Sequence, residues 1–549
     1  MAFLGGQSMN SIDYSIIAVY LVGLLFLGFY FRQQSSRGDY FLGGRSLGWF
    51  PLALSTMATQ LSAISFISAP AFVGIRDGGG MIWLSYELAV PLAMIFLMWT
   101  IMPRLYASGH VSIYEFLEER FDHVTRFLIS IVFQISRAFG TGISIYAIAL
   151  ILESMMGLPF WGAVLMIGVI TALYSLQGGM KAVVYADAIQ MGIIFLGIFL
   201  CAAFALHHLG GLSAVGKQLD PARFAAVSFA RLGLHGDEFG FLPMLFGGLV
   251  LYASYYGCDQ TQAQRILSAK DARTMRQTLL ANGLLRFPMV LLYCVMGLLI
   301  GALVMLSPDL PVSEIAATPD VMIPRFILTY LPHGLIGLLV VAILSSAMSS
   351  LSSVINSLSA VTTEDIALLR GDSLSERHYV LLSRISAMLW ALVILGFSFF
   401  GGAIADTVIE AINKVGSLFY GPILATFLLA IMLRDISARG ANWGLMAGVG
   451  GNLYLWLFVP QLFWFWWNVT GLLITLGVAI GVSLIIDQRR PAFAGFARAS
   501  REEPTLIAPW RETIILLIAF GVILGVIIGF ESLWTALTLS PEATAAKAL

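Results

Sequence analysis

Apolar runs of about 20 residues recur from one end of the chain to the other, and short polar segments separate them. A run of that length crosses a hydrocarbon core of roughly 30 Å as a helix, because a backbone in lipid must satisfy its own hydrogen bonds. The pattern therefore predicts an all-α polytopic membrane protein. We expect fourteen spans, near residues 13–31, 47–74, 80–103, 127–153, 160–177, 183–206, 240–258, 278–306, 326–360, 379–400, 407–432, 441–460, 463–486 and 512–532.

The composition agrees with a membrane location and narrows the function classes. Only 11% of the 549 residues are charged and 59% are hydrophobic, whereas a soluble domain carries about 25% charged residues. The longest stretches between spans, 207–239 and 487–511, are too short for a further folded domain, so we expect one transmembrane domain over residues 1–549. The net charge of −1 indicates no nucleic-acid partner, and the sequence holds no phosphate-loop motif for ATP-driven pumping.

Lysine and arginine are concentrated in every second loop, a bias that marks the cytoplasmic loops of membrane proteins. The alternation predicts that both termini lie on the extracytoplasmic side. We expect a multi-pass protein of a bacterial inner or plasma membrane, in contact with the lipid bilayer and without an obligate protein partner.

Two of the expected spans contain residues that interrupt helices. The second span is rich in Ser and Thr and carries Pro70 and Gly74, and the seventh ends at Gly257 before Asp259. Transporters bind substrate and ions where one helix in each inverted repeat is broken, although small residues also let helices pack closely. The offset of five spans predicts a five-plus-five inverted repeat. Its halves would be residues 47–206 and 240–432, with an extra helix at 13–31 and extra helices over 441–532.

A serine-rich stretch lies in the ninth expected span. Residues 345–357 hold seven serines, and a three-and-four spacing puts five of them on one helix face. Hydroxyls supply neutral acceptor oxygens, which suit a small hard cation such as sodium. A small-residue packing face is the alternative. The five serines of this stripe are Ser346, Ser349, Ser350, Ser353 and Ser357.

Asp187 lies near the cytoplasmic start of the sixth expected span. An ionisable residue in a membrane costs a few kcal/mol and is a functional candidate by default. A carboxylate is also a natural partner for a cation, so Asp187 favours the sodium interpretation of the serine helix. Alternatively, Asp187 is solvated at the interface or pairs with Lys181.

Several segments together resemble the sodium/solute symporter family, over most of the chain. The resemblance implies the LeuT-like inverted-repeat fold and sodium-driven symport by alternating access, with a small solute and sodium ions as the cargo. The segments that carry it are Asp39–Ser46, Ser112–Phe121, Gly178–Asp187, Gln264–Arg265 and the serine helix.

The resemblance also implies the sodium ligands. In this family one sodium ion sits between the first core helix and the eighth. Its ligands here would be the carbonyls of Ala58, Leu61 and Ser346 and the hydroxyls of Ser349 and Ser350. A second sodium ion in some members would use Asp187 with the hydroxyls of Ser349, Ser352 and Ser353. Because this chain has the whole second set, we expect two sodium ions per cycle.

The resemblance leaves the substrate open between two groups of anion carriers. Residues 145–152 and 360–365 resemble the branch that carries monocarboxylates, iodide and vitamins, whereas Ser62, Ser65 and Pro70 resemble the sialic acid carriers. Both groups support a small organic anion as the substrate.

Two arginines lie well inside apolar sequence. Arg286 falls where galactose carriers place a sugar-binding Lys, and Arg137 lies near the carboxylate-binding Arg of the sialic acid carriers. A guanidinium offers paired donors that suit a carboxylate. The alternative is that each arginine forms an internal ion pair, with Glu87 or Glu410 as partner.

A neutral sugar or polyol remains the alternative substrate. Glu87 and Tyr255 match the sugar-binding Glu and the inner-gate aromatic of the galactose carriers, and Asn413 would line the entry vestibule. Other function classes fit less well. A single serine helix does not form the ring of like ligands that a channel needs, and no histidine has a partner at a spacing typical of an enzyme. We therefore expect a transporter and not an enzyme.

Overall fold

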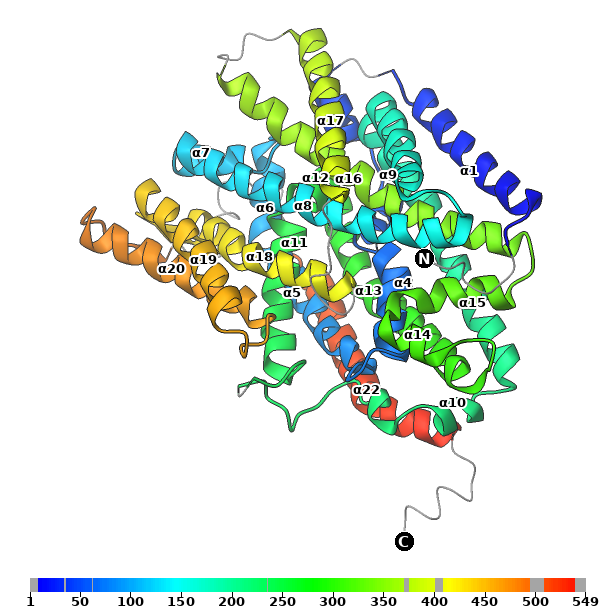
Figure 1. Ribbon diagram of the computed structural model, residues 1–549. Coiled ribbons are helices and arrows are strands. Elements are labelled where there is room, and N and C mark those ends of the chain that lie inside the picture. The colour runs from blue at the N-terminus through cyan, green and yellow to red at the C-terminus, as the bar shows by residue number, and fades with distance from the viewer. Residues whose placement is uncertain are drawn as a thin grey trace.

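The computed structural model describes residues 8–33, 36–61, 63–234, 236–369, 375–399, 408–493 and 508–538. The described chain is almost entirely helical (Figure 1). The first half of the chain forms α1 (Ser11–Tyr30), α2 (Arg37–Leu42), α3 (Trp49–Gln60), α4 (Ala63–Gly74), η2 (Met81–Leu88), α5 (Ala89–Trp99), α6 (Ile101–Ser108), α7 (Glu115–Arg120), α8 (His123–Met156), α9 (Phe160–Leu209) and α10 (Ser213–Gln218).

The second half continues in the same way, with one pair of very short strands. The strands are antiparallel and pair Leu433 with Phe493. The elements are η4 (Pro243–Gly247), α11 (Gly248–Gly257), α12 (Gln260–Leu267), α13 (Ala272–Leu306), α14 (Val312–Ala317), α15 (Met322–Tyr330), α16 (Leu335–Leu369), α17 (Glu376–Ser398), α18 (Val408–Met432), β1 (Leu433–Arg434), α19 (Ala438–Phe458), α20 (Trp466–Ile485), β2 (Ala492–Phe493) and α22 (Trp510–Thr538).

Ten of the described helices are long and apolar enough to cross a membrane, or eleven if α3 and α4 count as one bent span. The sequence predicted fourteen. The difference arises because two expected runs, 160–177 and 183–206, fall in the single element α9, and because α11 and α19 are not among the ten. The protein is thus an all-helical polytopic membrane protein, with ten or eleven candidate spans in its described part.

The 50-residue helix α9 is interrupted near its middle. At about 1.5 Å per residue it would extend about 75 Å, more than twice the hydrocarbon thickness. The break lies at Gly179, where φ is 54° and ψ is −152°. A side chain is excluded there, since a Cβ would lie 2.7 Å from the carbonyl oxygen of Tyr40. The break falls between the two apolar runs that the sequence predicted.

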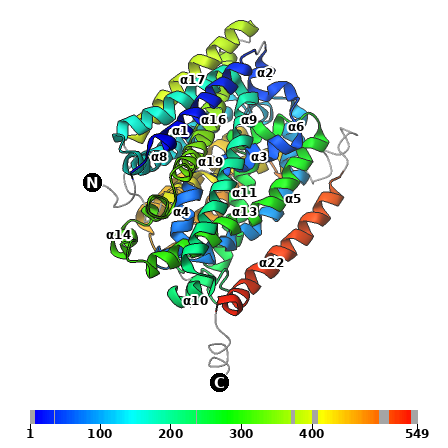
Figure 2. The ribbon, with the colours of Figure 1, turned by 90° about the vertical axis from the view of Figure 1, so that its right-hand side faces the viewer.

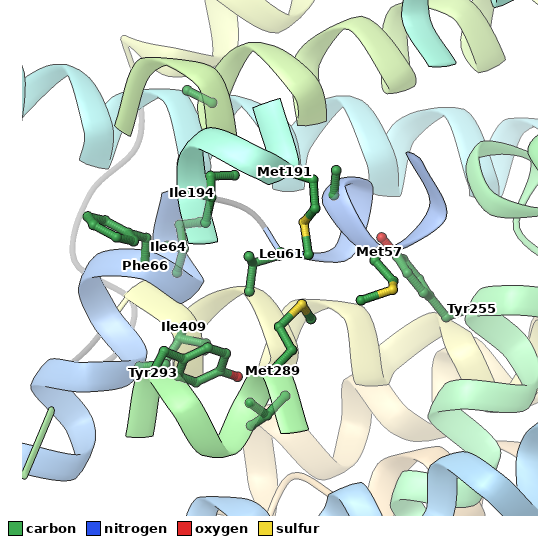
Figure 3. Close-up of a cluster of buried hydrophobic side chains, with 14 of the residues drawn as sticks. Met57, Leu61, Ile64, Phe66, Met191, Ile194, Tyr255, Met289, Tyr293 and Ile409 are labelled. Atoms are coloured by element: carbon green, nitrogen blue, oxygen red, sulfur yellow. The ribbon is translucent and has the colours of Figure 1, made fainter. Parts of the chain in front are cut away.

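The hydrophobic core surrounds the junction of α3 and α4, whose axes differ by 56°. Leu61, at the end of α3, has φ −80° and ψ 75° and leaves the helical conformation. Apolar side chains from α4, α9, α13 and α18 gather around it, including Met191 and Met289 (Figure 3). The interrupted backbone is therefore held inside protein rather than exposed to lipid, as a broken membrane helix requires.

The serine helix α16 packs against α3, α4, α8, α9 and α12 near the centre of the molecule (Figure 1). Other helices lie further out: α22 runs along the edge beside α5 (Figure 2), and α19 packs against α20. This arrangement brings the α3–α4 break, α9 and α16 together, although they are far apart in the sequence.

Candidate functional site

The first predicted sodium site lies where the α3–α4 break faces α16. The Ser346 hydroxyl donates to the Leu61 carbonyl at 2.8 Å, which joins the serine stripe directly to the interrupted backbone. Ala58 and Leu61 are fully buried. The buried Ser350 oxygen has no hydrogen-bond partner among the described residues, and Ser350 lines a cavity next to the break. Ser62, which the sequence placed in the substrate site, lies outside the described residues.

The second predicted site centres on Asp187 of α9. The hydroxyls of Ser349 and Ser55 donate to its two carboxylate oxygens at 2.6 and 2.5 Å. The Arg265 guanidinium of α12 lies 3.1 Å from the same carboxylate. The sequence suggested Lys181 or solvent as the alternative partner of Asp187. Both suggestions were wrong, because Asp187 is fully buried and its cationic partner is Arg265.

The two remaining serines of the second predicted site lie one turn further along α16. The Ser352 and Ser353 hydroxyls donate to the Ser349 carbonyl at 3.0 and 2.6 Å. The Ser353 oxygen also accepts a hydrogen bond from Arg265. Asp187, Ser349 and Ser353 are thus in one hydrogen-bonded cluster, with Ser352 beside it. The cluster holds hydroxyl, carbonyl and carboxylate oxygens, which are the ligand types that a hard cation prefers.

A cavity of about 150 Å³ adjoins the first predicted site. Its walls come from α3, α4, η2, α8, α11, α12, α13, α16 and α18. Glu87 contacts one of the lining residues, Arg286. Five residues that the sequence assigned to the substrate site line this cavity: Ser65, Arg137, Tyr255, Arg286 and Asn413.

Arg286 and Glu87 form a buried but incomplete ion pair. Arg286 Nη2 lies 3.4 Å from Glu87 Oε1, and that oxygen also accepts a hydrogen bond from the Tyr252 hydroxyl at 2.8 Å. Three polar atoms have no partner among the described residues: Arg286 Nε, Arg286 Nη1 and Glu87 Oε2. Buried polar groups are normally paired. This pair therefore keeps unused hydrogen-bonding capacity at the cavity.

Arg137 is held differently. Its guanidinium is paired with Asp259, and Nη2 donates to the Tyr420 hydroxyl at 3.4 Å. The rings of Tyr255 and Tyr420 lie 4.8 and 5.6 Å from the guanidinium carbon. The sequence named Glu87 or Glu410 as possible partners of either arginine. For Arg137 this was wrong, because its carboxylate partner is Asp259. Glu410 instead pairs with Arg76 at 2.9 Å.

Asn413 lines the cavity, while its side-chain amide donates to the Ile409 carbonyl at 2.8 Å. The sequence did not single out several other wall residues, since polar residues between apolar runs look like loops. Thr261 belongs to α12 and Asp259 caps its N-terminus, and this helix is polar yet fully buried within protein. The polar segment that directly follows the interrupted seventh span was the available signal. The wall residues that sequence reasoning missed include Gln60, Tyr86, Ser136, Thr141, Asp259 and Tyr420.

The site has the features of a binding cavity. Within the described ranges, no group of three or more His, Cys, Asp or Glu side chains could hold a transition-metal ion. What converges instead is a set of neutral oxygens at a helix break, the buried Asp187 carboxylate, and two cavity arginines that each pair with a further buried carboxylate. Such a constellation binds ions and a small solute near the middle of a membrane protein.

Comparison with known proteins agrees with this geometry. The model of the family described as Sodium:solute symporter family matches residues 40–448. The chain is 30% identical to sodium-coupled monocarboxylate transporter 1 of Xenopus laevis, over 81% of this chain and 71% of that protein. It is 29% identical to sodium/glucose cotransporter 1 of Ovis aries, over 80% of this chain and 70% of that protein.

Among solved structures, the chain resembles a Na⁺-coupled sialic acid symporter, with a TM-score of 0.79 at 23% identity, covering 88% of this chain and 99% of that one. This likeness shows a fold of the LeuT type. Fold and family together make the protein a sodium-coupled solute symporter and not an enzyme. The chain belongs to the sodium:solute symporter family.

Proposed function

We propose that this symporter imports a small organic anion, such as a monocarboxylate or a sialic acid, by alternating access. One observation carries the proposal: Arg286 lines the cavity, and two of its buried nitrogens, Nε and Nη1, have no hydrogen-bond partner among the described residues. Nη2 lies beside both of these nitrogens and uses one of its two N–H bonds for Glu87. An edge formed by Nη2 and either free nitrogen can therefore face the two oxygens of a carboxylate. A bound anion would complete the hydrogen bonding of Arg286 and offset the burial of its charge next to Glu87.

The proposed transport cycle uses two sodium ions. The first ion would be bound by the carbonyls of Ala58, Leu61 and Ser346 and by the hydroxyls of Ser349 and Ser350. The Ser350 oxygen, which has no partner in the described chain, supports this set. The second would bind at Asp187 with Ser349, Ser352 and Ser353. These neutral ligands around one carboxylate suit a monovalent cation that must bind and leave in each cycle.

We also propose how the chain is arranged in the membrane. Fourteen spans would form a five-plus-five inverted repeat over 47–206 and 240–432, with extra helices over 13–31 and 441–532. The break at Gly179 and the paired breaks at α3–α4 and α11–α12 support this arrangement. Both termini would then be extracytoplasmic, in a bacterial inner or plasma membrane, and the protein would act without an obligate protein partner.

A neutral sugar or polyol is the second candidate substrate. Both cavity arginines already have a carboxylate partner, Glu87 or Asp259. In addition, hydroxyls of α8 line the cavity at Ser136, Thr141 and Ser144, and hydroxyl-bearing solutes bind such groups. The two relatives reported above are named for a monocarboxylate and for glucose, so both substrate classes occur in the family.

Uptake into vesicles that contain the purified protein tests the proposal. We expect uptake to require an inward sodium gradient and to stop when potassium replaces sodium. A carboxylic acid should compete with the transported solute far better than its neutral amide or methyl ester. Equal inhibition by acid and amide would show that the substrate is not an anion and would favour the sugar or polyol.

The double variant Ser349→Ala with Ser350→Ala tests the sodium ligands. We expect sodium to stabilise the wild-type protein against heat in proportion to its binding, and the double variant to lose that response. The single variant Ser357→Ala, on the same stripe but outside the proposed ligand set, is the matched control. An unchanged sodium dependence in the double variant would remove this site.

A further inference from the structure

A permanent positive charge occupies the centre of the Asp187 site. Arg265 and Asp187 are both completely buried, and Arg265 Nη2 lies 3.1 Å from Asp187 Oδ2. An arginine cannot lose its proton in a protein, so the site holds a cation in this structure. The two residues come from different halves of the proposed repeat, on α12 and α9.

The hydrogen bonds around Arg265 form a complete set. Nε donates to Ser55 Oγ at 2.8 Å, and the Ser55 hydroxyl donates onward to Asp187. Nη2 also donates to Ser353 Oγ, whose hydroxyl donates to the Ser349 carbonyl. Nη1 donates to the Thr261 carbonyl. None of the polar side-chain atoms of Arg265 and Asp187 lacks a partner among the described residues.

A sodium ion at this site would need the same oxygens. The Asp187 carboxylate and the Ser353 hydroxyl belong both to the proposed sodium set and to the set that Arg265 contacts. Two cations cannot share these oxygens without strong repulsion in a medium of low dielectric constant. Occupation by Arg265 and occupation by sodium therefore exclude one another.

We propose that Arg265 is a tethered resident cation that sodium must displace from Asp187, so that the guanidinium and the ion occupy the site in turn. The inference rests on the proposed second sodium site. It implies that Arg265 neutralises the buried carboxylate whenever sodium has left. The empty carrier can then change conformation without a bare charge in its core, which would be costly.

The position of Arg265 also offers a link to the substrate cavity. Arg265 lies on α12, and Asp259 caps the N-terminus of this helix, where its side chain accepts from the Thr261 amide at 2.8 Å. Asp259 pairs with Arg137 at the cavity. A shift of α12 on substrate binding would thus move Arg265 relative to Asp187. Sodium affinity at Asp187 would then depend on the state of the cavity.

Equilibrium binding of radioactive sodium to the purified full-length protein, with potassium keeping the ionic strength constant, tests the inference. In the variant Arg265→Gln the competitor is gone and Asp187 is left without its cation. We expect the sodium concentration that half-saturates the Asp187 site to fall at least tenfold, and thermal stability to become more dependent on sodium. The double variant Arg265→Gln with Asp187→Asn should show neither the tighter sodium binding nor the greater dependence of thermal stability on sodium.

Arg126→Gln is the matched control, because Arg126 is also a buried arginine paired with a carboxylate, Asp365, on α16. It should leave sodium binding unchanged. Equal sodium binding by Arg265→Gln and the wild type would overturn the inference. If Arg265→Gln does not fold at any sodium concentration, Arg265→Lys replaces it, since a shorter and differently shaped cation is a weaker competitor. An unshifted midpoint in Arg265→Lys would likewise overturn the inference.

These outcomes are separate from a failure of the proposed function. A wild-type protein that binds one sodium ion in all states, with no ion lost in Asp187→Asn, would remove the second sodium site itself. Suppose instead that Asp187→Asn binds one sodium ion fewer than the wild type, while the midpoint of sodium binding is the same in Arg265→Gln and the wild type. That result would remove only the role of Arg265.

Discussion

Two of the buried arginine–carboxylate pairs in the described part of this transporter differ in how many of their polar atoms have hydrogen-bond partners. Arg265 and Asp187 are 3.1 Å apart, and four further groups donate to or accept from them. Arg286 and Glu87 are 3.4 Å apart, and three of their polar atoms have no partner in the described chain. The first pair lies beside the serine helix, and the second lies at the cavity.

The difference indicates how each pair can bind a ligand. The Arg286–Glu87 pair can receive a solute without breaking a contact, because its free donors and acceptor are already in place. The Arg265–Asp187 pair must open before an ion can bind, because its oxygens are in use. We infer that the cavity is prepared for its substrate, while the Asp187 site is closed by an internal competitor.

The largest expected effect is on stability. Removing one partner of a buried pair costs about 3–5 kcal/mol, so Asp187→Asn should lower the free energy of unfolding by an amount in this range. The Hill coefficient of uptake for sodium should fall from two towards one. Glu87→Gln is the paired comparison and should destabilise less, because its ion pair is incomplete. Equal losses of stability in both variants would contradict the contrast.

Substrate affinity should respond most to Arg286. Truncating a desolvated charge that binds an opposite charge costs about 2–5 kcal/mol, and a factor of ten in affinity corresponds to about 1.4 kcal/mol. Arg286→Ala should therefore weaken carboxylate uptake about a hundredfold or more. Arg286→Lys should recover only part, since lysine lacks the planar fork. Full recovery of carboxylate uptake in Arg286→Lys would indicate that the site requires only a positive charge and does not need paired N–H donors to the carboxylate.

Arg137 should matter less for affinity than Arg286. Its guanidinium is already paired with Asp259 and flanked by two tyrosine rings, so fewer of its donors are free for a solute. We expect Arg137→Gln to weaken uptake by about tenfold, or about 1.4 kcal/mol. Concentration-dependent uptake measures this directly. A loss greater than that of Arg286→Ala would identify Arg137 as the main anion contact.

The smallest expected effect is a pH dependence at the loop before α7. A hydrogen bond with Glu115, 3.3 Å away, raises the pKa of His110, and Glu119 adds to the shift. A raised pKa stabilises the folded state below the ordinary value of about 6.5, and this contribution is lost as the pH rises through the folded pKa. As the pH rises, thermal unfolding should show a decrease in the free energy of unfolding of less than about 1 kcal/mol. The variant His110→Gln should not show this decrease. Identical profiles of stability against pH in the wild type and His110→Gln would exclude His110 as the cause of the pH dependence.

Much of the site could be predicted from the sequence because its signals are local. The polar second span, the serine stripe and Asp187 each stand out against apolar surroundings, since polar groups are rare in membrane helices. Five of the proposed substrate residues do line one cavity. Hydropathy did not show that the runs 160–177 and 183–206 belong to one element, α9, with a break at Gly179. It also gave no sign that the polar segment α12 is buried by protein.

The sequence by itself determined that the chain is a helical membrane protein of a sodium-coupled family, since apolar length and short motifs carry that information. Only the tertiary structure decided which charges meet. Arg265 and Asp187 are 78 residues apart, and Arg286 and Glu87 are 199 residues apart. Partners at such separations depend on how α9, α12, α13 and η2 pack, and periodicity along the chain carries no record of that packing. The tertiary structure alone therefore showed that Arg286 has nitrogens without a partner in the described chain and that Arg265 pairs with Asp187.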